Sequence, residues 1–302
     1  MSYHIIHILQ HKCFLSIDRG CLVLKNDQGE KRAPLSDILA VIVAAHGVGF
    51  SGDCLSEIIK NGGIILHCDE NYRPIGKTSS LANVVHSEIF QRQVESPAEF
   101  CDKLWARVIR GKVENQASVL DILGVKHRLW DIISSGKIDE GNCARYYWKN
   151  YFPKFGRKAP KERERQGAEN PVNQMLNYAY AVMGAICHRS ILSHGLNPCL
   201  GIHHKYRFKA DPLLYDIMEP LRPFCDLMLI EFRLENPRND IKDFIKSVAK
   251  DFINIILRVG NKKVKIINAV DRYVSSVADC YYSGFPEQIY IPKIKEICDE
   301  SE

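Results

Sequence analysis

The hydrophobic pattern changes its period near residue 78, and this change restricts the chain to folds built from two unlike parts. Residues 3–50 contain short runs rich in β-branched and aromatic residues, separated by turn sequences such as 26–29, which is typical of strands. Further along, apolar residues recur at steps of three and four, as on one face of a helix. We therefore expect an α+β protein with a small β-rich domain at 1–78 and a larger, all-α-helical domain at 79–302.

Local signals place individual elements within both domains. Continuous apolar runs at 39–43 and 63–67 are typical of buried strands, and 52–61 is expected to form a short helix between them. In the second domain, proline at the first helical position indicates where helices begin. The expected elements there are helices starting at Pro97 (inside a capping box), at Pro171 and at Pro212 (kinked at Pro220), and two more at 241–256, ended by Gly260, and at 264–281.

Composition indicates a soluble, reduced protein that suits a polyanionic partner. The formal net charge is +5, but residues 1–80 hold eight basic and eight acidic side chains, so the surplus belongs to residues 81–302. A basic surplus there suits nucleic acid. Eleven cysteines without a CxxC pair argue against a disulfide framework or a zinc knuckle. We find neither an apolar run long enough for a membrane span nor a secretion signal, so we expect a cytoplasmic protein.

Three short segments carry the residues best suited to catalysis: Glu140, the pair His203–His204, and Asp216 with Glu219. Asp216 and Glu219 share a helix face, where two carboxylates repel unless a cation or a base lies between them. Each segment also has a plainer interpretation. Glu219 can pair with Arg222 on a solvated face, the histidines can be surface residues, and Glu140 can be an acid favoured at a helix N-terminus. Together, two carboxylates and one imidazole can hold a hard divalent cation with positions open for phosphate oxygens.

The segment 153–169 is basic and has no apolar period. It carries six Lys or Arg side chains against three Glu, together with two prolines and two glycines. One interpretation is a solvated surface loop. The other is a mobile basic segment that closes over the phosphates of nucleic acid.

Four elements of the sequence resemble one family. Residues 140–147 resemble the Glu-Gly-x-Ala-Ala-Arg-x-Tyr element of the CRISPR-associated integrase family known as Cas-one, and residues 173–180 resemble its Asn-x-x-Leu-Asn-Tyr-Gly-Tyr helix. Residues 200–204 are similar to its Leu-Gly-x-x-His element, and residues 214–223 to its Leu-x-x-Asp-x-x-Glu-Pro-Phe-Arg-Pro element. The departures, Ala179 and Leu221, are not ligand positions. The compact length and the double histidine most resemble the version found in type II CRISPR systems.

The resemblance implies that Glu140, His204 and Glu219 are the catalytic residues and metal ligands, with Asp216 as an outer acid. Two carboxylates and one imidazole suit Mg²⁺ or Mn²⁺ better than zinc. The implied function is the catalytic subunit of the CRISPR adaptation integrase, a metal-dependent DNA endonuclease and transesterase. In that reaction, the 3′-hydroxyl of new spacer DNA attacks a phosphodiester of the CRISPR array. The candidate phosphate contacts are Arg145, Arg163, Arg165, Lys205 and Arg222, of which Arg222 can instead orient Glu219.

The resemblance also implies the partners. The family works as homodimers joined to a small Cas-two dimer, so we expect a heterohexamer that binds double-stranded DNA, both prespacer and CRISPR repeat. The charge-neutral, apolar β-rich domain is the expected dimer interface. Other type II adaptation proteins are further candidate partners, and no membrane is expected. Two rival functions stay open: a stand-alone metal-dependent DNase or junction resolvase without integration, and a non-catalytic DNA-binding scaffold, which has no need of the three ligands.

Overall fold

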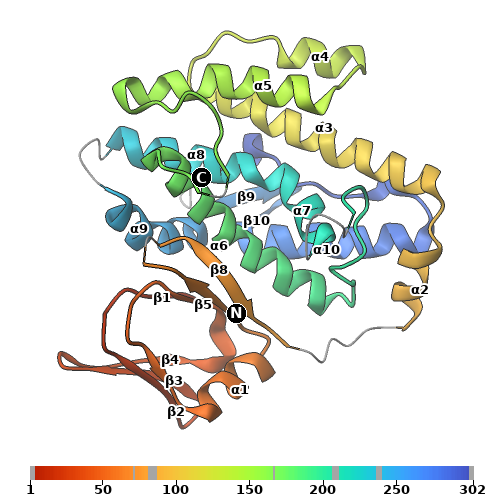
Figure 1. Ribbon diagram of the computed structural model, residues 1–302. Coiled ribbons are helices and arrows are strands. Elements are labelled where there is room, and N and C mark those ends of the chain that lie inside the picture. The colour runs from red at the N-terminus through yellow and green to blue at the C-terminus, as the bar shows by residue number, and fades with distance from the viewer. Residues whose placement is uncertain are drawn as a thin grey trace. The chain divides into compact units, whose positions relative to one another are not determined.

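The computed structural model describes residues 4–70, 72–80, 87–165, 167–205, 211–235 and 240–298. The chain divides into two compact units, Met1–Asn83 and Val84–Glu302 (Figure 1). The first unit holds two sheets and the second is largely helical, so the fold class expected from the change of hydrophobic period is confirmed. The last described strand of the first unit ends at Thr78, and the division between the units falls after Asn83.

Within residues 4–70 and 72–80, the N-terminal unit has two four-stranded sheets, one α-helix and a short 3-10 turn. In one sheet the strand order is β1-β5-β7-β8, with β8 antiparallel to β7 and the other pairs parallel. In the other the order is β4-β3-β2-β6, where β2, β3 and β4 form an antiparallel meander. The elements are β1 His4–Ile8, β2 Phe14–Asp18, β3 Cys21–Asn26, β4 Gly29–Pro34, η1 Leu35–Asp37, β5 Ile38–Val43, β6 Gly49–Phe50, α1 Gly52–Lys60, β7 Ile64–Cys68 and β8 Pro74–Thr78.

The core of this unit lies between the two sheets and α1. Every residue of β5 is buried, as expected for a continuous apolar strand between two parallel neighbours. Leu15 and Leu22 from the meander and Ile58 from α1 join Ile38 and Val41 in one cluster. The apolar runs therefore form strands and one amphipathic helix as predicted, because each has an apolar face to bury against the others.

The C-terminal unit is organised around α6, which packs against α7, α8, α9 and α10 (Figure 1). The long helix α3 packs against α4, α5, α8 and the turn η4, and so brings together segments far apart in sequence. The elements are α2 Ser87–Glu95, α3 Ala98–Ile122, α4 Leu129–Ser135, α5 Glu140–Tyr151, η2 Phe152–Lys158, α6 Pro171–Ser193, α7 Pro212–Met218, η4 Glu219–Leu221, α8 Arg222–Glu235, α9 Ile241–Asn254, β9 Ile256–Val259, β10 Lys262–Lys265, α10 Ile266–Ser283, η5 Pro286–Gln288 and η6 Ile294–Glu296.

The helices predicted to begin at Pro171 and Pro212 are found there. α3 begins at Ala98, after Pro97, but the predicted capping box is wrong, because no side chain caps this helix and Ser96 Oγ donates to the carbonyl oxygen of Arg92 at 2.6 Å. At α6, the side chain of Asn170 accepts a hydrogen bond from the N–H of Val172, and Pro171 is the first helical residue. The kink expected at Pro220 is also present. α7 ends at Met218, a single 3-10 turn contains Pro220, and α8 begins at Arg222. This break places Glu219 at the junction of two helices.

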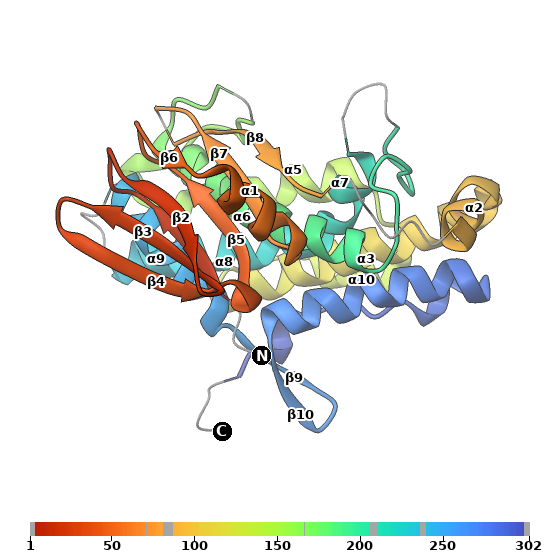
Figure 2. The same cartoon turned by 90° about the horizontal axis from the view of Figure 1, so that it is seen from below.

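One expectation for this unit is wrong, because it is not all-helical. The helix expected at 241–256 ends at Asn254, and Ile256–Val259 instead pairs with Lys262–Lys265 in an antiparallel hairpin that projects from the unit (Figure 2). Gly260 has φ of 60° and lies in the two-residue hairpin turn, so it does not end a helix. Gly260-Asn261 between short apolar runs is a hairpin signal. The isoleucines before it also fit the period of a helix, and this fit led to the wrong prediction.

Two findings concern the chain as a whole. Each of the eleven cysteines has a free thiol, in agreement with the absence of a disulfide pattern in the sequence. Within the described residues, no helix is both long and apolar enough to span a membrane.

Candidate active site

Two predicted ligands, Glu140 and Glu219, lie at the starts of short structural elements that α3 holds together. Glu140 is the first residue of α5, whose N-cap Asp139 accepts a hydrogen bond of 2.7 Å from the N–H of Asn142. Glu219 opens the 3-10 turn between α7 and α8. Asn115 on α3 fixes this turn, since its buried amide donates to the carbonyl oxygen of Pro220 at 2.8 Å.

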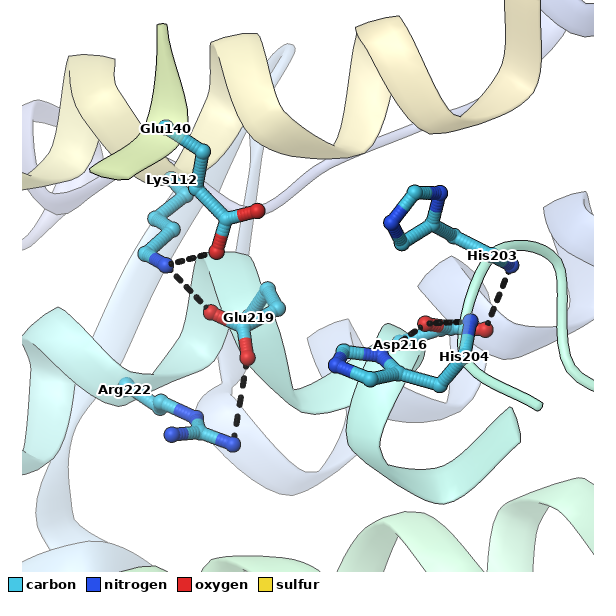
Figure 3. Close-up of polar contacts among 7 residues, drawn as sticks. All are labelled: Lys112, Glu140, His203, His204, Asp216, Glu219 and Arg222. Atoms are coloured by element: carbon cyan, nitrogen blue, oxygen red, sulfur yellow. Dashed lines mark hydrogen bonds and ion pairs between the residues drawn. The ribbon is translucent and has the colours of Figure 1, made fainter. Parts of the chain in front are cut away.

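The ammonium group of Lys112, on α3, lies between the two carboxylates (Figure 3). Lys112 Nζ is 2.8 Å from Glu140 Oε1 and 2.6 Å from Glu219 Oε2. On the other oxygen of Glu219, Oε1, the guanidinium of Arg222 makes an ion pair at 3.1 Å. The two acidic residues therefore share one internal cation, and Glu219 contacts a second.

Glu219 is ionised at neutral pH although it is buried. Burial by itself raises the pKa of this carboxyl group, but Arg222 and Lys112 outweigh that effect, and the resulting pKa is about 2. Its Oε2 is buried and is ion-paired with Lys112 Nζ at 2.6 Å. This oxygen keeps the capacity to accept a further cationic partner.

Asp216 holds His204 in one orientation. Its side chain is fully buried and accepts hydrogen bonds from the backbone N–H of His203 at 3.0 Å and of His204 at 3.3 Å. Asp216 Oδ1 also lies 2.6 Å from His204 Nδ1. Because Nδ1 is engaged, the nitrogen left for a ligand is Nε2, an arrangement common behind metal-binding histidines.

Gly201 makes this arrangement sterically possible. A Cβ atom at Gly201 would lie 2.3 Å from the carbonyl oxygen of His204, 2.9 Å from Cβ of Pro212 and 3.0 Å from Oδ2 of Asp216. Only glycine allows the backbone to approach that closely. The Leu-Gly element of the sequence thus determines where His204 lies.

His203 is exposed and packs on an aromatic neighbour. Its ring stacks on the indole of Trp105, with centroids 4.5 Å apart and planes within 4° of parallel. The ring of His204 meets the same indole edge-on, at 5.7 Å. Trp105 therefore orders both histidines, while the contact between Nδ1 and Asp216 distinguishes the ring of His204 from that of His203.

The three predicted ligands lie in one region but do not form a closed metal site. Among the described residues, no group of three His, Cys, Asp or Glu side chains is close enough to hold a metal ion. Figure 3 shows the ring of His204 directed toward Glu219, with Lys112 and Arg222 on the other side of that carboxylate. The donor set nevertheless fits a hard divalent cation, because it offers two carboxylates and an imidazole whose Nδ1 is engaged, which leaves Nε2 for a ligand. The assignment of the three ligands stays a prediction.

A cavity of about 770 Å³ opens beside this region. Glu140 and His203 line it, together with Trp105 and residues from the start of α5 and from η5. A second hollow of about 520 Å³ shares Arg107 and Arg110 with it and adds Lys293. The basic side chains that line the two hollows are Lys103, Arg107, Arg110 and Lys293.

Comparison with known proteins decides the family. The family model described as CRISPR associated protein Cas1 matches residues 6–269. The chain belongs to the Cas1 family. Among curated relatives, the CRISPR-associated endonuclease Cas1 of Neisseria meningitidis is 27% identical over 294 residues, covering 95% of each chain. The CRISPR-associated endonuclease Cas1 1 of Francisella tularensis subsp. novicida is 24% identical, covering 90% of this chain and 93% of its own. The Neisseria relative supports the resemblance to the type II version.

Solved structures share the Cas1 fold at low sequence identity. A casposase bound to integration product has a TM-score of 0.80 at 17% identity and covers 94% of this chain and 92% of its own. A Cas6-RT-Cas1–Cas2 complex has a TM-score of 0.78 at 14% identity, covering 97% of this chain and 36% of its own. A TtCas1–DNA complex has a TM-score of 0.65 at 14% identity, covering 94% and 92%. These structures establish that the Cas1 fold extends over nearly the whole chain.

The five basic residues that sequence analysis selected in this Cas1 chain divide into two groups. Arg145, Arg165 and Lys205 are exposed and so remain available to a ligand. Arg163 is directed inward, where its guanidinium donates to Asn177 Oδ1 at 2.6 Å and lies over the ring of Tyr180, 5.1 Å from its centroid.

Arg222 is also an internal residue. Its side chain is 20% exposed, it pairs with Glu219, and it lies 5.3 Å from the centroid of Tyr180. Of the two roles considered for Arg222, the structure supports orientation of Glu219.

The basic segment 153–169 is anchored to its neighbours. Lys154 Nζ donates to the carbonyl oxygen of Leu123 at 2.7 Å, and Glu164 Oε2 accepts from the N–H of Glu169 at 3.0 Å. Arg163 ties the segment to α6. Most charged side chains of the segment are exposed, among them Arg157, Lys161 and Arg165, as expected for a solvated surface segment. Arg163 is an exception, and the closure of the segment over phosphates stays a prediction.

A buried network joins three of the family elements behind the site. The carboxylate of Asp226 accepts hydrogen bonds from the hydroxyls of Tyr180 at 2.6 Å and Tyr147 at 2.9 Å. Burial raises the pKa of Asp226 to about 6, although those two hydrogen bonds act in the opposite direction. Since Tyr180 also supports Arg222, this network fixes the side chain that holds Glu219.

Four residues of this region are not among the predicted site residues: Lys112, Trp105, Arg107 and Arg110. The sequence does contain a signal for Lys112. It follows Phe100, Leu104 and Val108 at the same four-residue step, so it falls in the apolar stripe of the helix. A charge at a core position of a helix is expected to have a buried partner. Arg107 and Arg110 lie on the polar face of the same helix, with no local pattern to distinguish them from ordinary surface charges.

Proposed function

We propose that this chain is the catalytic subunit of an integrase of CRISPR adaptation, which joins the 3′-hydroxyl of incoming DNA to a phosphodiester of the CRISPR array. The observation that carries the proposal is the Glu140–Lys112–Glu219 cluster with His204 oriented by Asp216, in a chain of the Cas1 family. The casposase with the same fold is titled as bound to integration product, which supports strand transfer as the reaction class.

Strand transfer needs no energy-supplying cofactor. The attacking 3′-oxygen forms a bond to phosphorus, and the bond from that phosphorus to the target's own 3′-oxygen breaks. The proton of the attacking hydroxyl is replaced by one on the leaving oxygen, so the number of phosphodiester bonds is unchanged. Catalysis then depends on positioning and on stabilisation of the negative charge that develops on the phosphate.

Glu140, Glu219 and His204 are the residues that would hold Mg²⁺ or Mn²⁺, the first two through carboxylate oxygens and His204 through Nε2. When bound, such an ion acidifies the attacking hydroxyl and offsets charge on the phosphate. Arg222 keeps Glu219 in place and ionised, and Asp216 fixes the ring of His204. The protein supplies no nucleophile of its own in this reaction.

The cavity beside Glu140 is the proposed site for the reacting end of the DNA. Its volume of about 770 Å³ and the Trp105–His203 stack on its wall suit a nucleotide whose base packs on aromatic rings. Arg107 and Arg110 continue from it into the next hollow and are proposed to contact backbone phosphates. Of the contacts proposed from sequence, Arg145, Arg165 and Lys205 are retained, because their side chains are exposed.

The proposed assembly is a homodimer of this chain bound to a Cas2 dimer and to double-stranded DNA, both prespacer and CRISPR repeat. The Cas1–Cas2 and Cas1–DNA complexes with the same fold support both kinds of partner. The β-rich N-terminal unit is the proposed dimer interface. A stand-alone metal-dependent DNase is the second candidate function, and it is supported by the name endonuclease carried by the curated relatives.

An integration assay with the matching Cas2 and a supercoiled plasmid that carries the repeat tests the proposal. We expect covalent insertion of a labelled duplex with Mg²⁺ or Mn²⁺, and no insertion in chelator. Glu140→Ala, His204→Ala and Glu219→Ala are each expected to reduce strand transfer by several orders of magnitude. Glu88→Ala is the matched control, because it removes an acid that is 64% exposed and pairs with Arg92 on α2.

Three results would contradict parts of this proposal. Strand transfer that persists in chelator would exclude metal dependence. Cleavage of the plasmid without insertion would favour the stand-alone DNase. An inactive His203→Ala together with an active His204→Ala would show that the wrong histidine has been assigned as ligand.

A further inference from the structure

Lys112 belongs to no motif of the site, yet its ammonium lies at the centre of it. Its side chain is 10% exposed, and its partners Glu140 and Glu219 come from α5 and from the turn η4. Among the described residues, no other polar side chain contacts the carboxylate of Glu140. Lys112 is therefore the link between the two proposed acidic ligands (Figure 3).

The alternative of an ordinary structural ion pair does not explain this arrangement. A buried lysine loses hydration and needs one carboxylate to compensate it, whereas Lys112 has two, and Glu219 already pairs with Arg222. The ion pairs with Lys112 stabilise the two carboxylates, because Glu140 and Glu219 would repel each other without a cation between them. A divalent ion bound by the same two residues would supply that positive charge itself.

We propose that Lys112 is the internal cation of the metal-free site, which neutralises Glu140 and Glu219 until a divalent ion competes with it for the same carboxylates. The role rests on the proposed function in so far as it requires Glu140 and Glu219 to be ligands. A dication on these residues must share their oxygens with the ammonium or displace it. Lys112 thus acts as a positioning residue that keeps the unloaded site ordered and makes metal binding weaker than the acidic residues alone would allow.

The proposal has two linked consequences. Lys112→Met keeps an unbranched apolar stem and removes the charge. Glu140 then loses its ion pair and Glu219 keeps the one with Arg222, so the two carboxylates repel and the metal-free protein becomes less stable. A dication no longer meets a neighbouring positive charge, so its binding becomes tighter. By linkage, the stabilisation that the metal gives to the folded state increases in the variant. Lys112→Arg retains the charge and is expected to restore most of the wild-type behaviour.

The experiment measures Mn²⁺ affinity by titration calorimetry, and Tm in chelator and in excess Mn²⁺, for the full chain. We expect Lys112→Met to bind Mn²⁺ about tenfold or more tightly than the wild type, since a charge this near a dication costs at least that factor at protein-like dielectric constants. Its Tm in chelator is expected to fall by roughly 5 °C or more. The matched control is Lys246→Met on α9, whose lysine is 64% exposed and pairs with Asp243, and it should match the wild type in both measurements.

The proposal would be overturned if folded Lys112→Met bound Mn²⁺ no more tightly than the wild type does. If the wild type itself binds no Mn²⁺, the metal part of the proposed function fails, and a double-variant comparison in chelator decides the role of Lys112. In that comparison, the Tm loss caused by Lys112→Met must shrink when Glu140→Gln has already removed one of the repelling charges. An unchanged loss would show that Lys112 does not neutralise this pair.

Discussion

Replacement of Gly201 by alanine should inactivate the enzyme without touching any ligand. The added Cβ would lie 2.3 Å from the carbonyl oxygen of His204, where ordinary contact begins near 3.4 Å, so the two groups must separate by about 1 Å. The three groups that the added Cβ would approach cannot move away easily. One is a backbone oxygen, one belongs to the ring of Pro212, and one is the carboxylate of Asp216, which already accepts three hydrogen bonds.

The size of the effect follows from this geometry. Overpacking of this kind costs about 1–3 kcal/mol, and for a protein of this size each kcal/mol lowers Tm by roughly 2–4 °C. A shift of about 1 Å at a reacting group costs on the order of 100-fold in rate. We therefore expect Gly201→Ala to lose several degrees in Tm and about 100-fold in strand transfer at a temperature where it is fully folded.

The assay compares Tm and the strand-transfer rate of Gly201→Ala with those of Gly52→Ala. Gly52 lies at the start of α1, where a Cβ meets no atom within 4 Å, so this control should behave as the wild type. A folded Gly201→Ala with a strand-transfer rate within a few fold of the wild type would refute the reasoning, because it would mean that His204 is not held by the close approach at Gly201.

Two further predictions concern the buried network and the two hollows. Because the pKa of Asp226 is about 6 in the folded state against an ordinary 3.8, the folded state binds more protons between these values, and the contribution of Asp226 to stability falls by about 3 kcal/mol as pH rises from about 4 to 6. Urea unfolding at several pH values should therefore show Asp226→Asn gaining on the wild type over this range, and a constant difference would contradict the shift. Changing Arg107 and Arg110 to glutamine should reduce the slope of log affinity for duplex DNA against log salt by up to about 2, measured in chelator. Arg92→Gln, which lies outside both hollows, is the control, and an equal slope for all three proteins would remove these hollows from the DNA path.

The parts of the structure that could be predicted from the sequence are those fixed by neighbours along the chain. The start of α6 depends on Asn170 and Pro171, and the break before α8 depends on Pro220, so a short window contains all that determines them. The hairpin turn at Gly260-Asn261 is equally local, and it was missed because the apolar residues before it also fit a helical period.

The parts that could not be predicted depend on partners far away in the chain. Lys112 meets Glu140 and Glu219 only because α3 packs against both α5 and η4. Arg163 reads as one of several surface charges, yet its partners Asn177 and Tyr180 lie on the next helix. The sequence shows that such residues are charged, but it does not show whether a partner packs against them in the fold.

The charges of the site are compatible with the one divalent ion of the proposed function. Glu140, Glu219 and Asp216 supply three negative charges, and Lys112 and Arg222 supply two positive ones, so the cluster carries one net negative charge when His204 is neutral. A cluster of this charge attracts a dication and repels a phosphodiester. With a dication bound, the net charge becomes one positive, which matches the single negative charge of a DNA phosphate and favours the additional charge that develops during transfer. Without Lys112 the loaded cluster would be neutral, so the residue that weakens metal binding would also strengthen the hold on the phosphate.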